Sequence, residues 1–241
     1  LEPSDPGEVE VLRTLHEWDG QVAADSAGAA IYEVWLAALV ETALEPLVGD
    51  ELTGWLMGRS RSPIGVVAEH GGRIQVTLVE ALERGDPTFG ERRELLSLSL
   101  TAATRRLVRT LGDRVAGWRW GRLHRLNLRH ALASVPVLGW LFRAPSLEMG
   151  GDADTPCQFH PVLRPGRLPS DCSWSPGWRH VVDLGEPERA ATAHAGGQSG
   201  RLLSAHRLDG LRPWHRGELQ PNWMTPEDVR ANTERQVRLT P

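Results

Sequence analysis

Apolar residues recur every three or four positions through most of the first 112 residues, which is the periodicity of amphipathic helices. The pattern predicts three long helices, over 7–18, from Asp25 or Ser26 to about Val48, and over 91–111. The second is rich in small residues and apolar on more than one side, so we expect it to be buried. Between these helices the pattern predicts, in order, a short helical piece and loop over 49–63, a short helix or strand over 75–83, and a turn over 84–90.

The pattern changes after residue 113. An extended stretch with loops is predicted over 118–130, where leucines alternate with Arg and His, and an apolar connector over 136–145. Alternation predicts strands near 158–159, over 178–184 and over 190–194, and a short closing strand through Val237 and Leu239. Two further helices are predicted, from Ser204 through Trp214 and from a start at Thr225-Pro226.

These elements predict an α+β fold over residues 1–241, either one domain or part of one, mostly helical over 1–112 and built of strands plus closing helices over 113–241. The glycine-rich run Ala193–Gly200 joins the predicted strand at 190–194 to the closing helices. Three glycines in five residues indicate a backbone that takes positive φ or passes close to other groups.

The composition excludes few classes of protein or partner. The chain is 40% hydrophobic and 24% charged with a net charge of −4, typical of an ordinary globular protein. All 27 basic residues are Arg, and the mild acidity argues against nucleic acid as a main partner. Ten Trp beside one Tyr indicate a large core or buried subunit contacts. We find no apolar run that approaches a membrane span and no signal peptide, and a start at Leu1 suggests a processed chain or a fragment.

Ser199 is the obvious candidate nucleophile, with His206 and Asp209 following it. The nucleophile-elbow pattern requires glycine two residues before and two residues after the serine. Gly197 satisfies it and Arg201 does not. We therefore interpret the run as a structural turn, and keep a self-contained serine hydrolase as a weaker hypothesis.

Four residues could form a zinc site: Cys157, His160, Cys172 and His180. The Cys-x2-His spacing suits one half of such a site, but the second half is too widely spaced for the usual structural pattern. A disulfide between the two cysteines, or two free thiols, fits the sequence better. The sequence leaves that choice open.

Cations and aromatic residues mix in Trp118-Arg119-Trp120 and the arginines that follow. Such a mixture could suit nucleic acid. Arg packing on Trp at a crowded surface is the alternative, and the net negative charge favours it. His124 and His130 would share one face of a strand and could bind a metal, although structural histidines are more common.

Several segments, in order along nearly the whole chain, resemble the C-terminal part of the β subunit of the penicillin acylase family of N-terminal-nucleophile hydrolases. They are Leu12–Gly20 with Trp18-Asp19-Gly20, Ser26–Leu39, Trp120-Gly121-x2-His124-Arg125, the loop 150–155, Val181–Gly185, and Gly197–Gly200 with His206, Asp209, Trp214 and Gly217-Glu218. Two departures stand out: Arg207-Leu208-Asp209 replaces the family's tyrosine and acidic pair, and Pro156-Cys157-Gln158 replaces an Asn-bearing continuation.

The resemblance implies a four-layer αββα sandwich and hydrolysis of an N-acyl amide, such as a β-lactam side chain, an acyl-homoserine lactone or a lipopeptide. In that family the nucleophile is a Ser at the start of the β chain, whose α-amino group is the base. An Asn side chain and a backbone N–H form the oxyanion hole. All of these lie upstream of the matched region, so no catalytic, cofactor-binding or metal residue is assigned here, and Leu1 has no nucleophilic side chain.

The resemblance further implies that this chain supplies scaffold, is inactive alone, and has the rest of the β subunit and the α subunit as partners, with no nucleic acid or membrane. Any calcium ion would be bound upstream, and the location would be periplasmic or secreted. The alternative is a non-catalytic binding or scaffold module derived from an acylase. The acyl group and the oligomeric state stay open.

Overall fold

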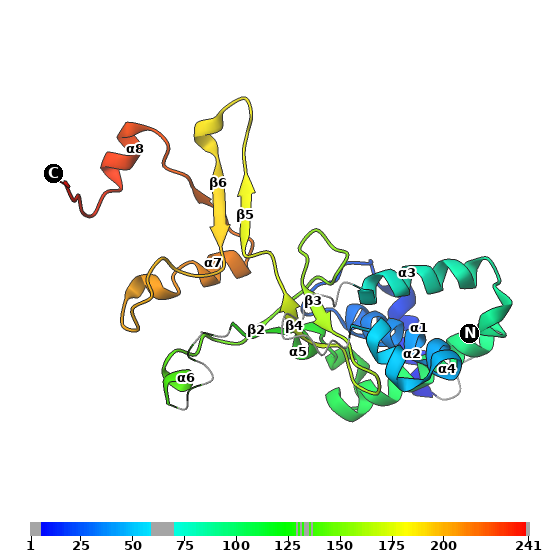
Figure 1. Cartoon of the computed structure of the whole chain (residues 1–241). Coiled ribbons are helices and arrows are strands. Elements are labelled where there is room, and N and C mark those ends of the chain that lie inside the picture. The colour runs from blue at the N-terminus through cyan, green and yellow to red at the C-terminus, as the bar shows by residue number, and fades with distance from the viewer. Residues whose placement is uncertain are drawn as a thin grey trace. The chain divides into compact units, whose positions relative to one another are not determined.

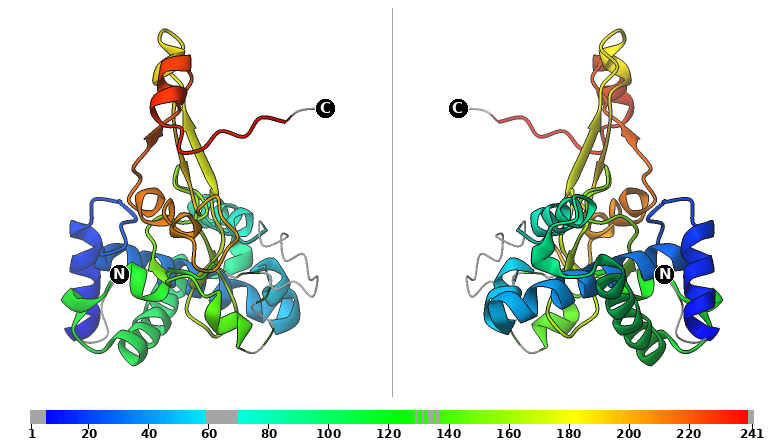
Figure 2. Two further views of the ribbon diagram at one scale, coloured as in Figure 1. Left: turned by 90° about the vertical axis from the view of Figure 1, so that its left-hand side faces the viewer. Right: turned by 90° about the vertical axis from the view of Figure 1, so that its right-hand side faces the viewer.

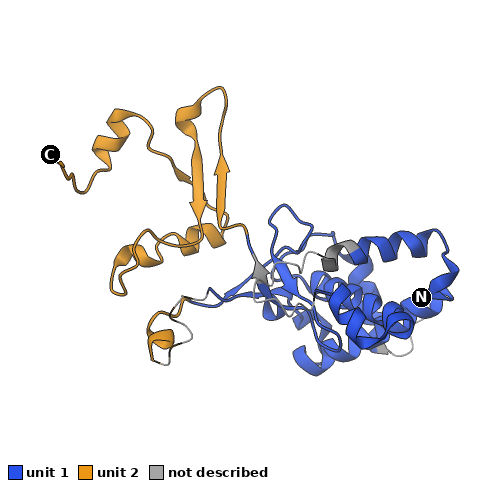
Figure 3. Cartoon of the chain, viewed as in Figure 1, with its two compact units in different colours: residues 1–129, 145–175 blue, residues 130–144, 176–241 orange. Residues whose placement is uncertain are grey.

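The computed structural model describes residues 6–58, 70–128 and 137–239, together with 130, 132 and 135. It is a mixed α and β structure, as the sequence predicts. The chain divides into two compact units: unit 1 comprises 1–129 and 145–175, and unit 2 comprises 130–144 and 176–241 (Figure 3). The boundary between the helical and mixed parts of the sequence, at 112/113, falls inside unit 1.

The first part of unit 1 is helical, as its periodicity predicts. Its four long helices are α1 (Pro6–Glu17), α2 (Ala27–Leu56), α3 (His70–Glu83) and α4 (Arg92–Leu111). Ser26 caps α2 by accepting the Ala29 N–H at 3.1 Å. The break predicted after Val48 is a kink at Gly49, whose φ is 77°. Residues 75–83 are helical rather than extended, and the end of the loop predicted over 49–63 lies outside the described residues.

Helix α2 runs through the core of unit 1 (Figure 1). One cluster packs its Ile31 and Val34 against α4 and two buried tryptophans, Trp118 and Trp120. A second cluster packs its Val40 against α3. Because both clusters contact α2, the prediction that this helix is buried is confirmed for residues 28–44, whereas residues 45–52 are exposed. By length and composition alone α2 could also cross a membrane, contrary to the expectation from the sequence, but 67% of its apolar window is buried inside the structure.

Two polar contacts fix α2 against α4. The Trp35 indole N–H donates to Ser99 Oγ at 2.9 Å. Arg106 forms a bidentate ion pair with Glu41, with N···O distances of 2.8 and 2.9 Å. The Gly166 N–H also donates to Glu41 Oε1, at 3.0 Å. Glu41 therefore ties two helices and a loop together, with its charge compensated.

The second part of unit 1 differs in detail from the prediction. Residues 118–130 are not one extended stretch: a helical turn α5 (Trp120–Leu123) precedes the short strand β1 (Arg125–Leu126). Strand β1 pairs antiparallel with β2 (Leu147–Glu148). The strand predicted near 158–159 lies slightly later, as β3 (His160–Val162), and pairs with β4 (Ser170–Trp174), which the sequence pattern did not reveal.

Unit 2 is built on a three-stranded antiparallel sheet in the order β5 (Trp178–Val181), β6 (Ala191–His194), β7 (Gln220–Pro221). The predicted pairing of the two longer strands is confirmed, with Trp178 opposite His194. In Figure 2, β5 and β6 (yellow) run side by side. The single helix predicted over 204–214 is wrong, because residues 208–210 interrupt it: a 3₁₀ turn at Ala205–Arg207 is followed by α7 (Leu211–His215).

The remaining elements of unit 2 are short. The apolar connector contains a helical turn, α6 (Leu138–Leu141). Helix α8 (Pro226–Ala231) begins as predicted, with Thr225 Oγ1 accepting the Asp228 N–H at 3.1 Å. The closing strand predicted through Val237 and Leu239 is wrong, since both residues are exposed and outside regular structure. Among the described residues of unit 2, the buried hydrophobic side chains are Ala190, Ala193, Leu211 and Trp214.

Candidate functional site

Three segments of unit 1 that are far apart in sequence meet through backbone hydrogen bonds, and we call them the glycine junction: residues 22–26, 120–121 and 149–151. The Gly121 N–H donates to Ala24 O at 2.7 Å, and the Gly151 N–H donates to Val22 O at 2.6 Å. The Trp120 indole N–H donates to Gly151 O at 2.9 Å. The junction therefore joins segments that the sequence singled out separately.

The glycine junction requires glycine because atoms of neighbouring segments lie too close to leave room for a Cβ. A Cβ on Gly121 would lie 2.7 Å from the Glu148 Cβ, and one on Gly150 would lie 2.7 Å from Val22 O. Gly151 also has a φ of 74°, which favours glycine. Any side chain at these positions would separate the three segments.

His124 follows the junction and is fully buried. Its ring stacks on Trp120, with centroids 4.6 Å apart, and its Nδ1 lies 3.3 Å from Met149 O. Burial lowers the pKa of His124 to about 4, so the ring is neutral at pH 7. His124 lies in unit 1 and His130 in unit 2, where it stacks on Phe142, so the prediction that they share a strand face is wrong.

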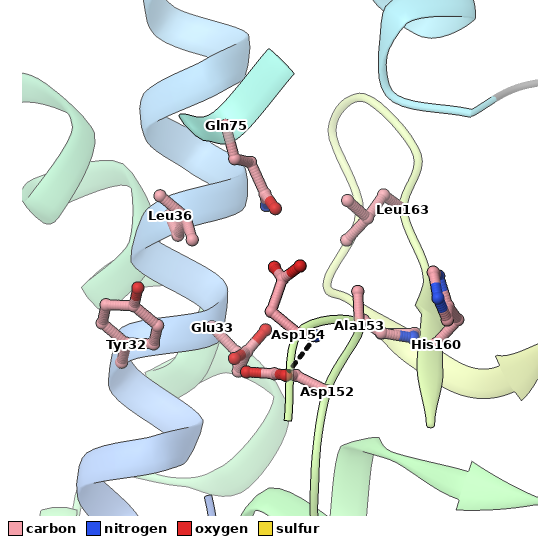
Figure 4. A pocket seen from close by; sticks show the side chains of 10 residues that line it. Tyr32, Glu33, Leu36, Gln75, Asp152, Ala153, Asp154, His160 and Leu163 are labelled. Carbon is pink, nitrogen blue, oxygen red and sulfur yellow. Dashed lines mark hydrogen bonds between the residues drawn. The ribbon is translucent and has the colours of Figure 1, made fainter. Parts of the chain in front are cut away.

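A cavity of about 100 Å³ lies beside the junction, between α2, α3, β3 and the loop 152–154. Its lining residues are Tyr32, Glu33, Leu36, Gln75, Asp152, Ala153, Asp154, His160, Pro161 and Leu163. Figure 4 shows the carboxyl groups of Glu33 and Asp152 beside each other, with Asp154 pointing into the space between Leu36 and Leu163.

The loop at this cavity is fixed by Asp152. Its Oδ1 accepts the N–H groups of Asp154, at 2.7 Å, and Thr155, at 2.8 Å. The Thr155 hydroxyl in turn accepts the Asp152 N–H at 3.0 Å. The loop thus directs the Asp152 carboxyl toward α2 (Figure 4).

Glu33 is the unusual acid of this cavity. It is 5% exposed on an otherwise apolar stretch of α2. Burial raises the pKa of Glu33 well above its usual range, and the charge of Asp152 and a hydrogen bond to its carboxyl raise it further. Both effects favour the protonated form of the Glu33 carboxyl, which faces Asp152.

The chemistry available in the cavity is limited. Its ten lining residues include no serine, threonine, cysteine or lysine, and so no common nucleophile for amide hydrolysis. Its volume corresponds to about three water molecules, whereas small-molecule sites are roughly 300 Å³ or more. With this volume the cavity is too small for an acyl amide.

Sequence reasoning missed this cavity. Glu33 lies within a predicted buried helix, and Asp152 within a predicted loop, with nothing nearby that pairs them. A carboxyl at a position that periodicity places in the core was the signal that could have identified Glu33. Its partner could not be identified, because 118 residues separate the two acids.

The structure brings Ser199, His206 and Asp209 near one another, although not as a catalytic triad. His206 Nδ1 lies 2.8 Å from Asp209 Oδ2, and this hydrogen bond raises the pKa of His206. The Ser199 N–H donates to His206 O at 3.0 Å, while its Oγ accepts the Arg201 N–H at 3.2 Å. Ser199 therefore contributes backbone contacts to a turn.

The glycines around Ser199 allow neighbouring backbone segments to lie close together. A Cβ on Gly197 would lie 2.0 Å from His206 O, and one on Gly210 would lie 2.2 Å from Gly196 O. Neither glycine has positive φ, so contact rather than conformation requires them. This supports the interpretation of the run as a structural turn.

The four candidate zinc ligands do not form a cluster. Cys157 is a free, exposed thiol, so it is not bonded to Cys172, which lies in β4 opposite Pro161. His180 lies in unit 2, where its Nε2 is 3.2 Å from Asn222 Nδ2. Among the residues that the structure describes, no three His, Cys, Asp or Glu residues are placed to hold a metal ion.

Comparison with known proteins finds related sequences along most of the chain. The sequence model of the family described as penicillin amidase matches residues 2–231. An acyl-homoserine lactone acylase QuiP of Pseudomonas putida is 29% identical over 86% of this chain and 25% of its own length. The penicillin acylase 2 proenzyme of a Pseudomonas species is 26% identical over 96% of this chain and 29% of its own length.

A QuiP acylase of Pseudomonas fluorescens is similarly 26% identical over 96% of this chain and 28% of its own length. The chain thus spans between a quarter and a third of the length of these relatives.

Proposed function

The chain belongs to the penicillin amidase family, and from that membership we propose that it is the C-terminal portion of the β subunit of an acylase that hydrolyses N-acyl amides. The observation that carries the proposal is the match over residues 2–231, combined with relatives that extend well beyond it. Within the complete protein this chain would supply scaffold, with its helices and strands forming part of a four-layer αββα sandwich.

The cavity at Glu33 supports the scaffold role. It is too small for a substrate and has no Ser, Thr, Cys or Lys in its lining, while the buried Glu33 faces Asp152 of the loop 152–154. Ser199 lies in a turn that close backbone contacts fix. The catalytic groups would therefore be contributed by other segments: a serine at the start of the β chain acting with its own α-amino group, and an oxyanion hole.

The names of the relatives suggest an order for testing substrates. Those compared above are two acyl-homoserine lactone acylases and a penicillin acylase. We therefore propose acyl-homoserine lactones as the first substrate class, β-lactams with an acyl side chain as the second, and lipopeptides as the third. A bound calcium ion outside this chain, association with the α subunit, and a periplasmic or secreted location belong to the same proposal.

Turnover tests the proposal directly. The complete gene product and the 241-residue chain would each be incubated with an acyl-homoserine lactone and a penicillin, and the released amine quantified by mass spectrometry. We expect turnover from the complete product alone. Turnover by the 241-residue chain would contradict the scaffold role.

Two controls separate the alternatives. In the complete protein, Ser199→Ala should leave turnover unchanged, because the Oγ accepts a backbone N–H within a turn. Loss of turnover with intact folding would favour a self-contained serine hydrolase. The mass and N-terminal sequence of the native protein form the second control, since the absence of an accompanying Ser-led chain would favour a non-catalytic module.

A further inference from the structure

The sheet of unit 2 has one covered face. On that face the Arg179 guanidinium lies 5.1 Å from the centroid of the Trp214 ring, and Arg179 Nη1 donates to Trp214 O at 2.7 Å. Ala193, opposite Arg179 in the register, is 4% exposed. Helix α7 therefore covers the face to which Arg179 and Ala193 belong.

The opposite face is uncovered but ordered. Alternation along the strands places Trp178 and His180 of β5 on it, beside Thr192 and His194 of β6. Trp178 is 63% exposed and stacks on His180, with centroids 5.2 Å apart. Asn222 joins His180 to Thr192, with contacts of 3.2 and 2.9 Å. These side chains are held in place by one another while the face stays open.

In the part of the chain that the structure describes, the backbone edge of β5 is open as well, because β5 is the outer strand of the sheet. Gly177 O accepts the Ala195 N–H at 3.0 Å, so positions 177, 179 and 181 direct their backbone groups toward β6. The N–H and C=O groups of Trp178 and His180 consequently point away from the sheet. Its register shows no bulge, and it contains neither proline nor lysine, the usual protections of an exposed edge.

We propose that the open edge and the Trp178 face of β5 bind an extended segment of the same polypeptide that lies outside these 241 residues. The segment adds a strand beside β5 through backbone hydrogen bonds and places an apolar side chain against Trp178. This inference rests on the proposed function, which assigns most of the protein to regions outside the chain.

Two observations favour this occupant. The relatives compared above are three to four times the aligned length, so a large part of such a protein is available to supply the segment. The described part of unit 2 buries only four hydrophobic side chains, and a small sheet needs a packed apolar face for independent stability. A segment of the same polypeptide would complete this unit without an association step.

Hydrogen–deuterium exchange tests the edge. The amides of Trp178 and His180 would be followed by mass spectrometry in the complete gene product and in the 241-residue chain. We expect exchange at least about tenfold slower in the complete product, because a docked strand would accept these N–H groups.

A proline substitution makes the test specific. His180→Pro removes an N–H that faces away from β6, so it spares the β5–β6 hydrogen bonds while blocking an added strand. His180→Ala is the matched control, since it removes the same ring and keeps the N–H. We expect the Trp178 amide to lose protection in His180→Pro and to keep it in His180→Ala.

The outcomes are distinct. Equal, rapid exchange in the complete product and the chain would overturn the inference, and so would identical behaviour of the two variants. Protection of the 241-residue chain that rises with its concentration would assign the edge to a second copy and overturn the proposed occupant. Turnover by the complete product, measured in parallel, separates these failures from failure of the proposed function.

Discussion

Units 1 and 2 share one feature, a buried tryptophan that donates a hydrogen bond to the backbone, but they differ in the hydrophobic core around it. In each, a fully buried tryptophan donates its indole N–H to a backbone carbonyl: Trp120 to Gly151 O at 2.9 Å, and Trp214 to Pro176 O at 3.0 Å. Trp120 lies in a core cluster built from four helical segments and the residues around them, whereas Trp214 shares its burial with Leu211 and two alanines. Unit 1 therefore has a hydrophobic core of its own, and unit 2 has only the beginning of one.

The two units also differ in where their ion pairs and paired acids lie. Unit 1 buries acids with partners, as in Glu41 with Arg106 and Glu33 with Asp152. The ion pairs of unit 2 lie in solvent, as in Arg216 with Glu218. Buried pairs are costly to break and exposed pairs contribute little. The difference indicates that unit 1 is specified internally, while unit 2 depends on what covers it.

The largest expected effect comes from the two tryptophans. Trp120→Ala should destabilise unit 1 by about 3–5 kcal/mol, because it leaves a cavity in a close-packed core and removes a hydrogen bond. Trp214→Ala should cost clearly less, since fewer neighbours lose contacts. Urea unfolding followed by far-ultraviolet circular dichroism, with segment-resolved hydrogen exchange to separate the units, measures both. Equal losses of stability in the two variants would contradict the difference between the cores of the two units.

Charge removal gives the next effect. Arg106→Met should cost about 3 kcal/mol, because it leaves the buried Glu41 carboxylate without its arginine partner. Arg216→Met, which breaks an exposed pair in unit 2, should have no measurable effect on thermal unfolding. A loss in Arg216→Met as large as that in Arg106→Met would show that unit 2 is more tightly packed than its burial indicates.

The helices were predictable because their signals are local. The cap at Ser26 and the kink at Gly49 follow from residues within one turn of the feature they specify. The pairing of β5 with β6 was predictable for the same reason, since only residues 182–190 separate the two strands along the chain. In each case the residues that determine the structure are neighbours in sequence.

The errors occur where distant contacts decide the structure. Alternation predicted an extended stretch at 118–130, but the N–H groups of Trp120 and Gly121 donate to residues 24 and 26, which places this segment as a helical turn. The cavity at Glu33 likewise depends on a loop more than 100 residues later. The spacing of apolar residues along the chain contains no information on contacts with segments that are distant in sequence.

A smaller effect, within unit 2, separates two adjacent glycines. Gly197→Ala should destabilise the turn by about 1–3 kcal/mol, because its Cβ would overlap His206 O. Gly196→Ala is the matched control: no atom lies within 4 Å of its Cβ and its φ is not positive, so we expect little change. Thermal unfolding and exchange of the Ser199 amide, which donates to His206 O, compare the two. Equal behaviour would mean that this turn is loosely held.

The last expected effect is a gain in stability, and it concerns a proton in unit 1. The pKa of Glu33 is raised by folding, so the folded state retains a proton that the unfolded state releases above its ordinary value near 4.3. Stability from this group is therefore complete below about pH 4 and falls as the pH rises toward the folded pKa. Glu33→Gln keeps a neutral donor facing Asp152 and removes that loss, with each unit of pKa shift contributing about 1.4 kcal/mol.

The pH dependence of stability that Glu33 contributes can be distinguished from that of His124. The pKa of His124 is lowered to about 4, so its contribution is lost as the pH falls below about 6.5, opposite in direction to that of Glu33. Unfolding free energies of the parent chain and Glu33→Gln, measured from pH 4 to 8, should coincide at the acid end and diverge upward for the variant above it. A variant that is less stable at pH 8 would mean that Glu33 is ionised and compensated, and that unit 1 buries a charge here rather than a shared proton.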